Sequence, residues 1–377
     1  MIRKIIYLTI VISLLGISVF LGQKAQNSDM EKVIGDNFDN IKSIQKISDN
    51  CYYLYNEKKL FGKPTSILII SKGIGYSGSI QVGVNYSTDG KILEAKVLHQ
   101  TETPVFFKRV SKGKFIEQYF GKSVKENFSL GNNIAAVSGA TISCSGINSA
   151  IEKANRQACQ SYFHEKLHGK KGMRPPDKKE VFLVILLSLT LIVSRSKKIT
   201  VRRYLPVIRI ISLVGLGFVF KGLLSISHFN NLLVGNFPAR QYYWYLLLGF
   251  FIFTILLTGK NLYFSYICPM GTLQDYLAKL SPKKIKITNR KYYRYPAIFF
   301  TLVILCYAAI FNKPGFFGYE IFSAVFMLDF SFYMAVIVVI ALFGSLLIPR
   351  FWCRFLCPVG VVGRFLMMVR RLFIKKK

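Results

Sequence analysis

Long apolar runs separated by clusters of lysine and arginine constrain this chain more than any other feature. The runs are 181–194, 204–227, 242–258, 297–311 and 330–348, with a further one, 5–21, near the N-terminus. A helix that crosses a bilayer needs roughly 20 predominantly apolar residues. The shortest run reaches that length if its flanking lysines and arginines extend toward the membrane surface. The pattern predicts an α-helical transmembrane bundle of about six spans.

The basic residues favour a membrane protein over a nucleic-acid-binding one. The formal net charge is +33, and 52% of the residues are hydrophobic. The lysines and arginines adjoin the apolar runs, whereas a nucleic-acid-binding domain carries them as a stripe across a polar fold. Clusters at 195–203, 283–291 and 370–377 fall on one side of the predicted spans. The positive-inside rule makes that side cytoplasmic, so we expect a multi-pass protein in contact with the lipid bilayer and no nucleic-acid partner.

The stretch between the first two apolar runs is polar and mixed in composition. Arg3 and Lys4 precede the first run, and no small-residue cleavage site follows it, so we expect an uncleaved membrane anchor at 1–26. Residues 27–172 are then expected to form an extracytoplasmic α+β domain. The remaining part, 178–377, is expected to form a five-span membrane module.

Strand signals define the predicted α+β domain. A buried strand is expected at 66–70, and alternating apolar residues in 80–86 and 93–97 flank Asp89-Gly90, which predicts a hairpin. The glycines of 73–78 match G-x-G-x-x-G. A strand follows them, whereas the dinucleotide-binding fingerprint requires a helix, so we interpret them as a tight entry into the hairpin.

Small residues and hydroxyls crowd the segment 133–150 just before a helical pattern. That pattern places apolar residues on one helix face at Ile147, Ala150, Ile151 and Ala154. Thr141 therefore lies at a loop-to-helix junction. The free N–H groups and the dipole of a helix start favour a phosphate there. The residue types alone favour a simpler role, in which Ser138, Thr141 or Ser143 caps the helix.

The sequence Ser138-Gly139-Ala140-Thr141 resembles the attachment motif of FMN-binding domains in RnfG, NqrC and NosR-type membrane proteins. In that family a flavin transferase acting outside the cytoplasm esterifies the threonine hydroxyl to the FMN phosphate. The resemblance implies a covalent FMN on Thr141, with Ser138, Gly139 and Ala140 forming the phosphate loop. The chain departs from the family at Ala135, where an aspartate is usual.

Polar residues follow the predicted return strand in the stretch His99-Gln100-Thr101-Glu102-Thr103-Pro104. Pro104 cannot continue a ladder of hydrogen bonds, so the strand is expected to stop there. Taken alone, these side chains are ordinary surface polarity at a strand end. They resemble the H-x-x-E-T-P stretch of the same family, which implies that Glu102, Thr103 and His99 lie near the flavin ring. The preceding loop, with Tyr76, resembles the opening of the FMN domain.

A cysteine-proline motif occurs twice in the membrane half. Residues 263–271 match 352–360 in register, and each copy follows an apolar run on its predicted cytoplasmic side. Cys353 and Cys357 are spaced i, i+4 and can share a helix face. Soft thiolates so arranged select iron–sulfur clusters or zinc. Each cysteine on its own can equally be an ordinary buried apolar residue.

The duplicated motif resembles the C-x-x-x-C-P pairs of the membrane iron–sulfur module in NosR and NapH, where four such cysteines are the expected ligands. The resemblance implies that Cys268, Cys353 and Cys357 bind an iron–sulfur cluster of the 4Fe-4S type. Phe264 stands where the first copy should have its other cysteine. Three alternatives stay open: Cys306 is the fourth ligand, another residue type is, or no stable cluster forms. The remaining cysteines are expected to be structural: Cys51, Cys144 and Cys159.

Together these resemblances imply an electron-transfer protein of the bacterial inner membrane. Electrons would pass between a cytoplasmic-side iron–sulfur centre or quinone and an extracytoplasmic FMN, with a membrane or extracytoplasmic redox partner. Flavin couples such partners because it exchanges one or two electrons. The resemblance implies an electron-transfer component of an oxidoreductase system and not a stand-alone enzyme, and we assign no catalytic side chains. The alternative is a sensor, maturation factor or structural subunit of the same architecture, because both departures, Ala135 and Phe264, fall at chemical positions.

Overall fold

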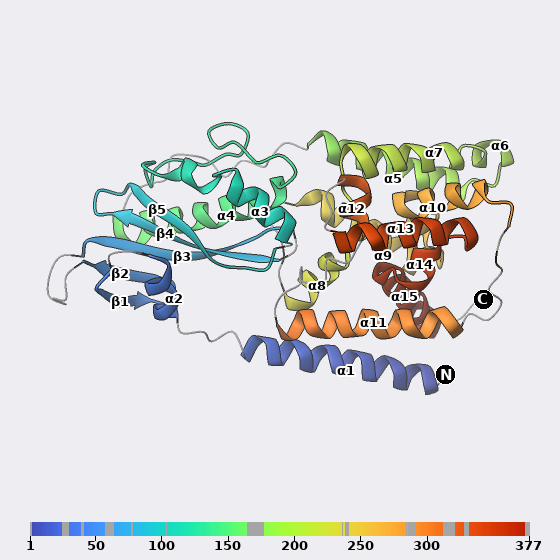
Figure 1. The fold of residues 1–377 in the computed structure, drawn as a ribbon, viewed down its shortest axis with the longest axis horizontal. Coiled ribbons are helices and arrows are strands. Elements are labelled where there is room, and N and C mark those ends of the chain that lie inside the picture. The colour runs from blue at the N-terminus through green and yellow to red at the C-terminus, as the bar shows by residue number, and fades with distance from the viewer. Residues whose placement is uncertain are drawn as a thin grey trace.

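The computed structural model describes residues 2–24, 30–38, 41–56, 64–76, 78–102, 104–163, 177–235, 237, 241–283, 285, 291–311, 321–327 and 332–373. A half built on a β-sheet follows the N-terminal helix, and a helical half follows the sheet (Figure 1). The candidate residues of the sequence fall into both halves.

Five antiparallel strands form one sheet in sequence order. They are β1 (Ser43–Ser48), β2 (Cys51–Tyr55), β3 (Ser66–Ile74), β4 (Ser79–Ser87) and β5 (Ile92–Gln100). The predicted hairpin is β4–β5, and Gly90 turns it with a φ of +78°. The α+β prediction for this part is confirmed, although the sequence did not indicate β1 and β2.

Helices cover both faces of the sheet. α4 (Thr141–Ala158) packs on one face and α2 (Met30–Asn37) on the other. Successive residues of β3 serve the two cores in turn: Ile67 and Ile69 pack with the α4 side, and Leu68 and Ile70 with the α2 side. This explains the continuous apolar run, since each such side chain contributes roughly 1.5–3 kcal/mol when buried. The sheet half also contains α3 (Pro104–Lys112), η1 (Ile116–Tyr119) and η2 (Cys159–Phe163).

The described residues of the helical half are mostly helical. The helices of this half are α5 (Lys178–Arg195), α6 (Ile199–Arg202), α7 (Leu205–Ser212), η3 (Leu213–Val219), α8 (Ile226–Val234), α9 (Tyr242–Thr258), η4 (Tyr263–Ile267), α10 (Pro269–Leu280), α11 (Lys291–Ile310), α12 (Ile321–Met327), α13 (Phe332–Leu347), α14 (Phe351–Phe355) and α15 (Pro358–Phe373). The N-terminal helix α1 (Ile2–Lys24) runs alongside α11 (Figure 1). The first helix of the chain therefore packs with the helical half, although the sheet half lies between them in sequence.

Helices occupy most of each apolar run for which a span is predicted, namely α1, α5, α7 with η3, α9, α11 and α13, but residues 220–225 of the run 204–227 are not helical. The expectation for these runs is therefore confirmed only in part. Within the part of the chain that the structure describes, however, no single helix combines the length and the apolarity needed to cross a membrane.

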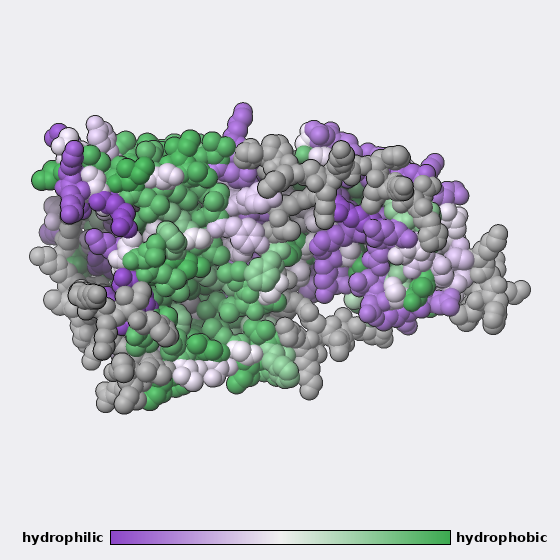
Figure 2. All heavy atoms as spheres, turned by 180° about the vertical axis from the view of Figure 1, so that it is seen from behind, coloured by the Kyte–Doolittle hydropathy of each residue, from purple (hydrophilic) through white to green (hydrophobic). Residues whose placement is uncertain are grey.

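The helical half exposes many large apolar side chains. Figure 2 shows a broad hydrophobic surface over this half and a more hydrophilic one over the sheet half. Exposed examples come from separate helices: Ile192, Phe253, Phe299 and Phe343. Soluble monomers rarely expose apolar patches larger than a few hundred Å². We therefore expect this surface to be covered by apolar material when the protein is in its native setting.

Candidate functional site

The loop between β3 and β4 lies directly against the start of α4. A Cβ atom on Gly146 would be 2.8 Å from the Gly75 nitrogen and 2.9 Å from the Gly75 Cα. A Cβ atom on Gly73, in β3, would collide with the Gly146 carbonyl oxygen. Only glycines permit this approach of backbone to backbone. As expected, the glycine-rich loop leads into a strand, β4, and not into a helix.

Glu102 joins this loop to α4. Its carboxylate is 4% exposed and accepts hydrogen bonds from the Gly78 N–H, at 3.3 Å, and from the Ser143 hydroxyl. Glu102 thus lies beside the first turn of α4 and, being buried, is not ordinary surface polarity. His99 lies in β5 opposite Gln81 with an exposed side chain. Thr103 lies outside the described residues.

α4 begins at Thr141, where the apolar spacing predicts it. Its N-cap is Ala140, which is buried and provides no side-chain cap hydrogen bond. The capping role that residue types alone favour for Ser138, Thr141 or Ser143 is therefore wrong. Ser143 turns to Glu102 instead, while Ser138 and Thr141 are exposed. The first turn is left as an uncapped, positively polarised helix start.

Arg109 is a residue that sequence reasoning missed. It belongs to α3, and a Cβ on Gly139 would collide with its guanidinium Nη1. Gly139 has a φ of +76°, which glycine adopts without strain. The guanidinium therefore lies against the loop that precedes Thr141. No spacing in the sequence links positions 109 and 139, so only the fold brings this cation to the loop.

The same loop contacts the helical half. The Gln241 side chain donates a hydrogen bond to the Gly75 carbonyl at 3.3 Å. The Tyr76 ring packs edge-on against His228, with ring centroids 5.6 Å apart, and His228 packs in turn on Trp244 at 5.6 Å. The sequence singled out Tyr76 but neither Gln241 nor His228, because these contacts join segments more than 150 residues apart.

The two cysteine-proline motifs have the same backbone arrangement. The Cys268 N–H donates to the Tyr263 carbonyl at 2.8 Å, and the Cys357 N–H donates to the Trp352 carbonyl at 3.0 Å. In both copies the proline that follows begins a helix, α10 or α15. The repeat predicted from the sequence is therefore also a structural repeat.

The structure brings the predicted thiols together. Cys353 and Cys357 lie within hydrogen-bonding reach of each other, and Cys268 is close enough to both to interact electrostatically. Cys268 and Cys357 are buried and Cys353 is partly so. The Gln274 side chain donates to the Cys353 sulfur at 3.2 Å. Among the described residues, no group of three or more His, Cys, Asp and Glu side chains is arranged to hold a metal ion.

A partly buried charge network lies next to the thiols. Arg350 donates two hydrogen bonds of 2.7 Å to the two carboxylate oxygens of Asp275, and Arg209 donates to the same carboxylate. A third Arg350 bond, 3.2 Å long, goes to the Phe264 carbonyl. The guanidinium is near enough to Cys268 and Cys353 to interact with both. It places fixed positive charge beside the sulfurs.

Phe264 differs from its counterpart Cys353 in environment. Its ring packs against Tyr263 and Phe251, with centroid distances of 5.3 and 6.0 Å. Cys306 is half-buried in α11. The other cysteines, Cys51, Cys144 and Cys159, are buried in the core of the sheet half, as expected for structural residues.

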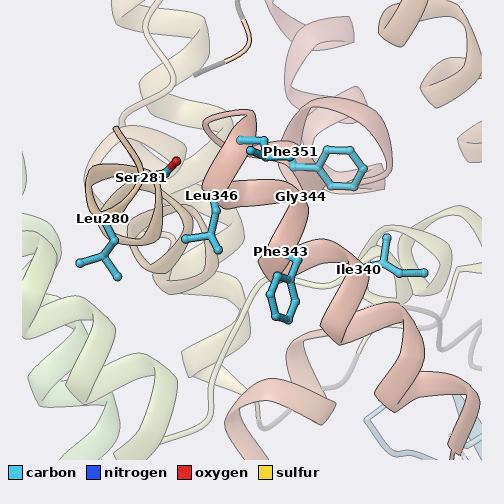
Figure 3. A pocket seen from close by; sticks show the side chains of 8 residues that line it. Leu280, Ser281, Ile340, Phe343, Gly344, Leu346 and Phe351 are labelled. Atoms are coloured by element: carbon cyan, nitrogen blue, oxygen red, sulfur yellow. The ribbon is translucent and has the colours of Figure 1, made fainter. Parts of the chain in front are cut away.

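An apolar hollow of about 790 Å³ opens between α10, α13 and α14 (Figure 3). Its lining includes Leu280, Ile340, Phe343 and Phe351, with Ser281 as the polar exception. None of the clustered thiols lines it. Apart from Ser281, its lining has no polar or reactive side chain. The candidate sites are therefore the α4 start and the thiol cluster.

Comparison with known families assigns chemistry to both sites. Residues 75–156 match the FMN-binding domain, and residues 241–288 and 330–377 each match the 4Fe-4S binding domain. FMN and an iron–sulfur cluster are therefore the cofactors of this chain. The first match contains the glycine-rich loop, Glu102 and the α4 start, and the second contains all three clustered thiols.

Two curated relatives carry parts of this arrangement. The chain is 30% identical over 156 residues to electron transport protein YccM of Escherichia coli (strain K12), covering 37% of this chain and 43% of the relative. It is 28% identical over 100 residues to a subunit of the proton-translocating ferredoxin:NAD(+) oxidoreductase complex of Clostridium ljungdahlii, covering 25% of this chain and 54% of the relative. The chain thus matches about half the length of each relative.

The residues present fit both cofactors to different degrees. An exposed hydroxyl on Thr141, an uncapped helix start and the Arg109 guanidinium suit a phosphate. Cys268, Cys353 and Cys357 provide three thiols of the residue type that an iron–sulfur cluster needs, whose usual ligand set is four cysteines, although their side chains are not arranged to hold a metal ion in this structure. The fourth expected position is held by Phe264. The α4 start is therefore a candidate phosphate site, and the three thiols are candidate cluster ligands.

Proposed function

We propose that this chain is a NosR-like membrane electron-transfer protein. It passes electrons between an iron–sulfur centre held by Cys268, Cys353 and Cys357, or a quinone, and an FMN attached to Thr141 on the opposite side of the membrane. Two findings support this: both cofactor-binding domains occur in one chain, and the YccM relative is described as an electron transport protein.

The contact between the two halves carries the proposal. Gln241 and His228, both in the helical half, touch the Gly75–Tyr76 loop, and this loop borders Glu102 and the start of α4. A flavin held there would lie at the junction with the helical half and not on a remote face of the sheet. Both cofactors would then be held by parts of one molecule that contact each other.

Each residue at the α4 start has a role in holding the flavin. Thr141 provides the hydroxyl that a flavin transferase joins to the FMN phosphate, with net loss of one water. Arg109 and the first-turn N–H groups neutralise the phosphate charge, and Ser138, Gly139 and Ala140 leave room for it. Glu102 and Tyr76 border the ring. When bound, FMN supplies one- or two-electron exchange.

We place the helical half in the bacterial inner membrane, with the FMN domain outside and the C-terminus in the cytoplasm. The exposed apolar side chains of α1, α5, α9, α11 and α13 support a lipid neighbour. The basic clusters on one side of the apolar runs support the orientation. The relative that belongs to a proton-translocating oxidoreductase complex is consistent with a membrane setting.

The deciding experiment is an intact-mass measurement of the full-length protein co-expressed with an active flavin transferase. We expect a mass increase equal to FMN minus water, mapped to the Thr141 peptide and absent in Thr141→Ala. The same preparation is assayed for iron and acid-labile sulfide. Protein that carries neither flavin nor iron, while the transferase modifies a control substrate, would refute the proposal.

The departure at Ala135 supports a second candidate, a membrane sensor or maturation factor with lost redox chemistry. Gln118 exchanges hydrogen bonds of 2.8 and 3.0 Å with the Ala135 backbone, and alanine offers no carboxylate there. If a transferase needs that carboxylate, the flavin stays non-covalent or is absent. A colourless purified protein favours this candidate, whereas flavin and iron–sulfur absorption favour electron transfer.

A further inference from the structure

We propose that Gln274 is a positioning residue that raises the reduction potential of the iron–sulfur centre through the Cys353 sulfur. This role rests on the proposed function, because it presupposes a cluster at the thiols. It adds a residue outside both copies of the C-x-x-x-C-P motif. Neither the motif nor its spacing points to position 274.

The Gln274 carboxamide is completely buried and held from several sides. Its Nε2 donates to the Cys353 sulfur and to the Met270 carbonyl, each at 3.2 Å. Its Oε1 accepts the Trp352 N–H at 2.9 Å and lies 3.2 Å from the Ser345 hydroxyl. The backbone N–H of Trp352 can only donate a hydrogen bond, so the end of the Gln274 amide that faces it must be the oxygen. The NH₂ group must therefore face the sulfur.

The contact crosses the structural repeat. Gln274 lies in α10, after the first cysteine-proline motif, but it reaches Cys353 in the second motif. Cys353 is the counterpart of Phe264, the position at which the first copy lacks its thiol. In the same register, the second copy has Gly363 in place of Gln274. The repeat therefore provides this N–H donor to one of its sulfurs only.

The effect on the centre follows from electrostatics. Reduction adds negative charge to the cluster and its sulfur ligands, so an N–H aimed at a sulfur stabilises the reduced form more than the oxidised form. Burial strengthens this preference because little water screens it. Arg350, which Asp275 holds beside Cys268 and Cys353, acts in the same direction. Gln274 differs from it in touching the sulfur directly.

The test is a redox titration of the full-length protein followed by electron paramagnetic resonance. Gln274→Met keeps the side-chain length but removes the donor. We expect iron and sulfide per protein to stay the same, while the reduction equilibrium shifts at least tenfold toward the oxidised form, which is 59 mV for one electron. The matched control is Thr190→Val, which removes a buried hydrogen bond of 2.7 Å to the Leu186 carbonyl in α5. Its potential should not change.

A second measurement does not depend on whether the variant folds. In the wild-type protein labelled with ¹⁵N in glutamine side-chain amides, the reduced centre should show a ¹⁵N hyperfine coupling. Unchanged potential in iron-loaded Gln274→Met, or no such coupling in the wild type, would overturn the role of Gln274. A wild-type protein with no iron–sulfur signal would instead refute the centre itself, and this role with it.

Discussion

Substituting Gly146 by alanine should separate α4 from the glycine-rich loop. The added Cβ would be 2.8 Å from the Gly75 nitrogen and 2.9 Å from both the Gly75 Cα and the Ile74 carbonyl carbon. All three are backbone atoms, so no side chain can rotate away. The helix or the loop must move, and both border the proposed flavin.

The magnitude follows from two opposing effects. Alanine in a helix is favoured over glycine by roughly 0.5–1 kcal/mol, while overpacking a tight contact costs roughly 1–3 kcal/mol. Because backbone atoms make up the contact, we expect a cost at the upper end of its range, which leaves a net destabilisation of about 2 kcal/mol. Gly35→Ala is the matched control: it lies in α2 of the same half, with no atom within 4 Å of the new Cβ. It should stabilise by roughly 0.5–1 kcal/mol.

Amide hydrogen exchange of the full-length protein, read on peptides from β3 and α4, measures both effects. Gly146→Ala should raise exchange in these peptides roughly 30-fold, since about 1.4 kcal/mol corresponds to tenfold in an opening equilibrium. Gly35→Ala should leave them as protected as the wild type or more so. Equal protection in the two variants would show that α4 and the loop are not in the close contact described.

Further predictions concern the two candidate sites and the buried Cys144. Arg109→Met should lower FMN loading at least tenfold, because a hydrogen bond to a charged group is worth roughly 1.5–3 kcal/mol; full loading by mass would remove Arg109 from the phosphate site. Phe264→Cys should raise iron per protein, and an unchanged iron content would mean that the fourth ligand lies elsewhere. Burial raises the pKa of the Cys144 thiol, so its alkylation at pH 8 should be slow until the protein unfolds. The raised pKa of Cys144 in the folded protein contributes stability that is fully present at pH values below the pKa of the thiol in the unfolded chain. This contribution is lost as pH rises through the pKa of the thiol in the folded protein, so the protein should unfold more easily in alkali.

Local patterns predicted a large part of the fold. The β4–β5 hairpin followed from alternation around Asp89-Gly90, and the start of α4 at Thr141 followed from helical spacing. Both depend on neighbours in sequence, where periodicity carries the information. The duplicated cysteine-proline motif was predictable for the same reason, because two copies of one local arrangement share one backbone pattern.

Long-range partners were not predictable in this way. Ser143 hydrogen-bonds Glu102 instead of capping its helix, and Arg109 lies on Gly139 although no periodicity joins them. The sequence did not predict β2 either, because Cys51–Tyr55 is short and apolar and shows no clear alternation. Its burial depends on pairing with β1 and β3. The expected crossing of a membrane rested on summed hydropathy. Helices occupy most of each of these runs, but among the described residues none alone meets the length and apolarity required.

A short series of contacts connects the two sites although they are far apart in sequence. Gln241 holds the glycine-rich loop, and two residues later the Tyr243 hydroxyl donates to the Gly222 carbonyl at 2.7 Å. Close to Gly222 in sequence, the backbone N–H of Leu224 donates to the Tyr263 hydroxyl at 3.2 Å. The Tyr263 carbonyl in turn accepts the Cys268 N–H. The irregular segment between η3 and α8 is therefore held between the glycine-rich loop and the thiol cluster. Hydrogen bonds and short stretches of chain thus join the two candidate sites, which supports the proposal that one chain carries both cofactors.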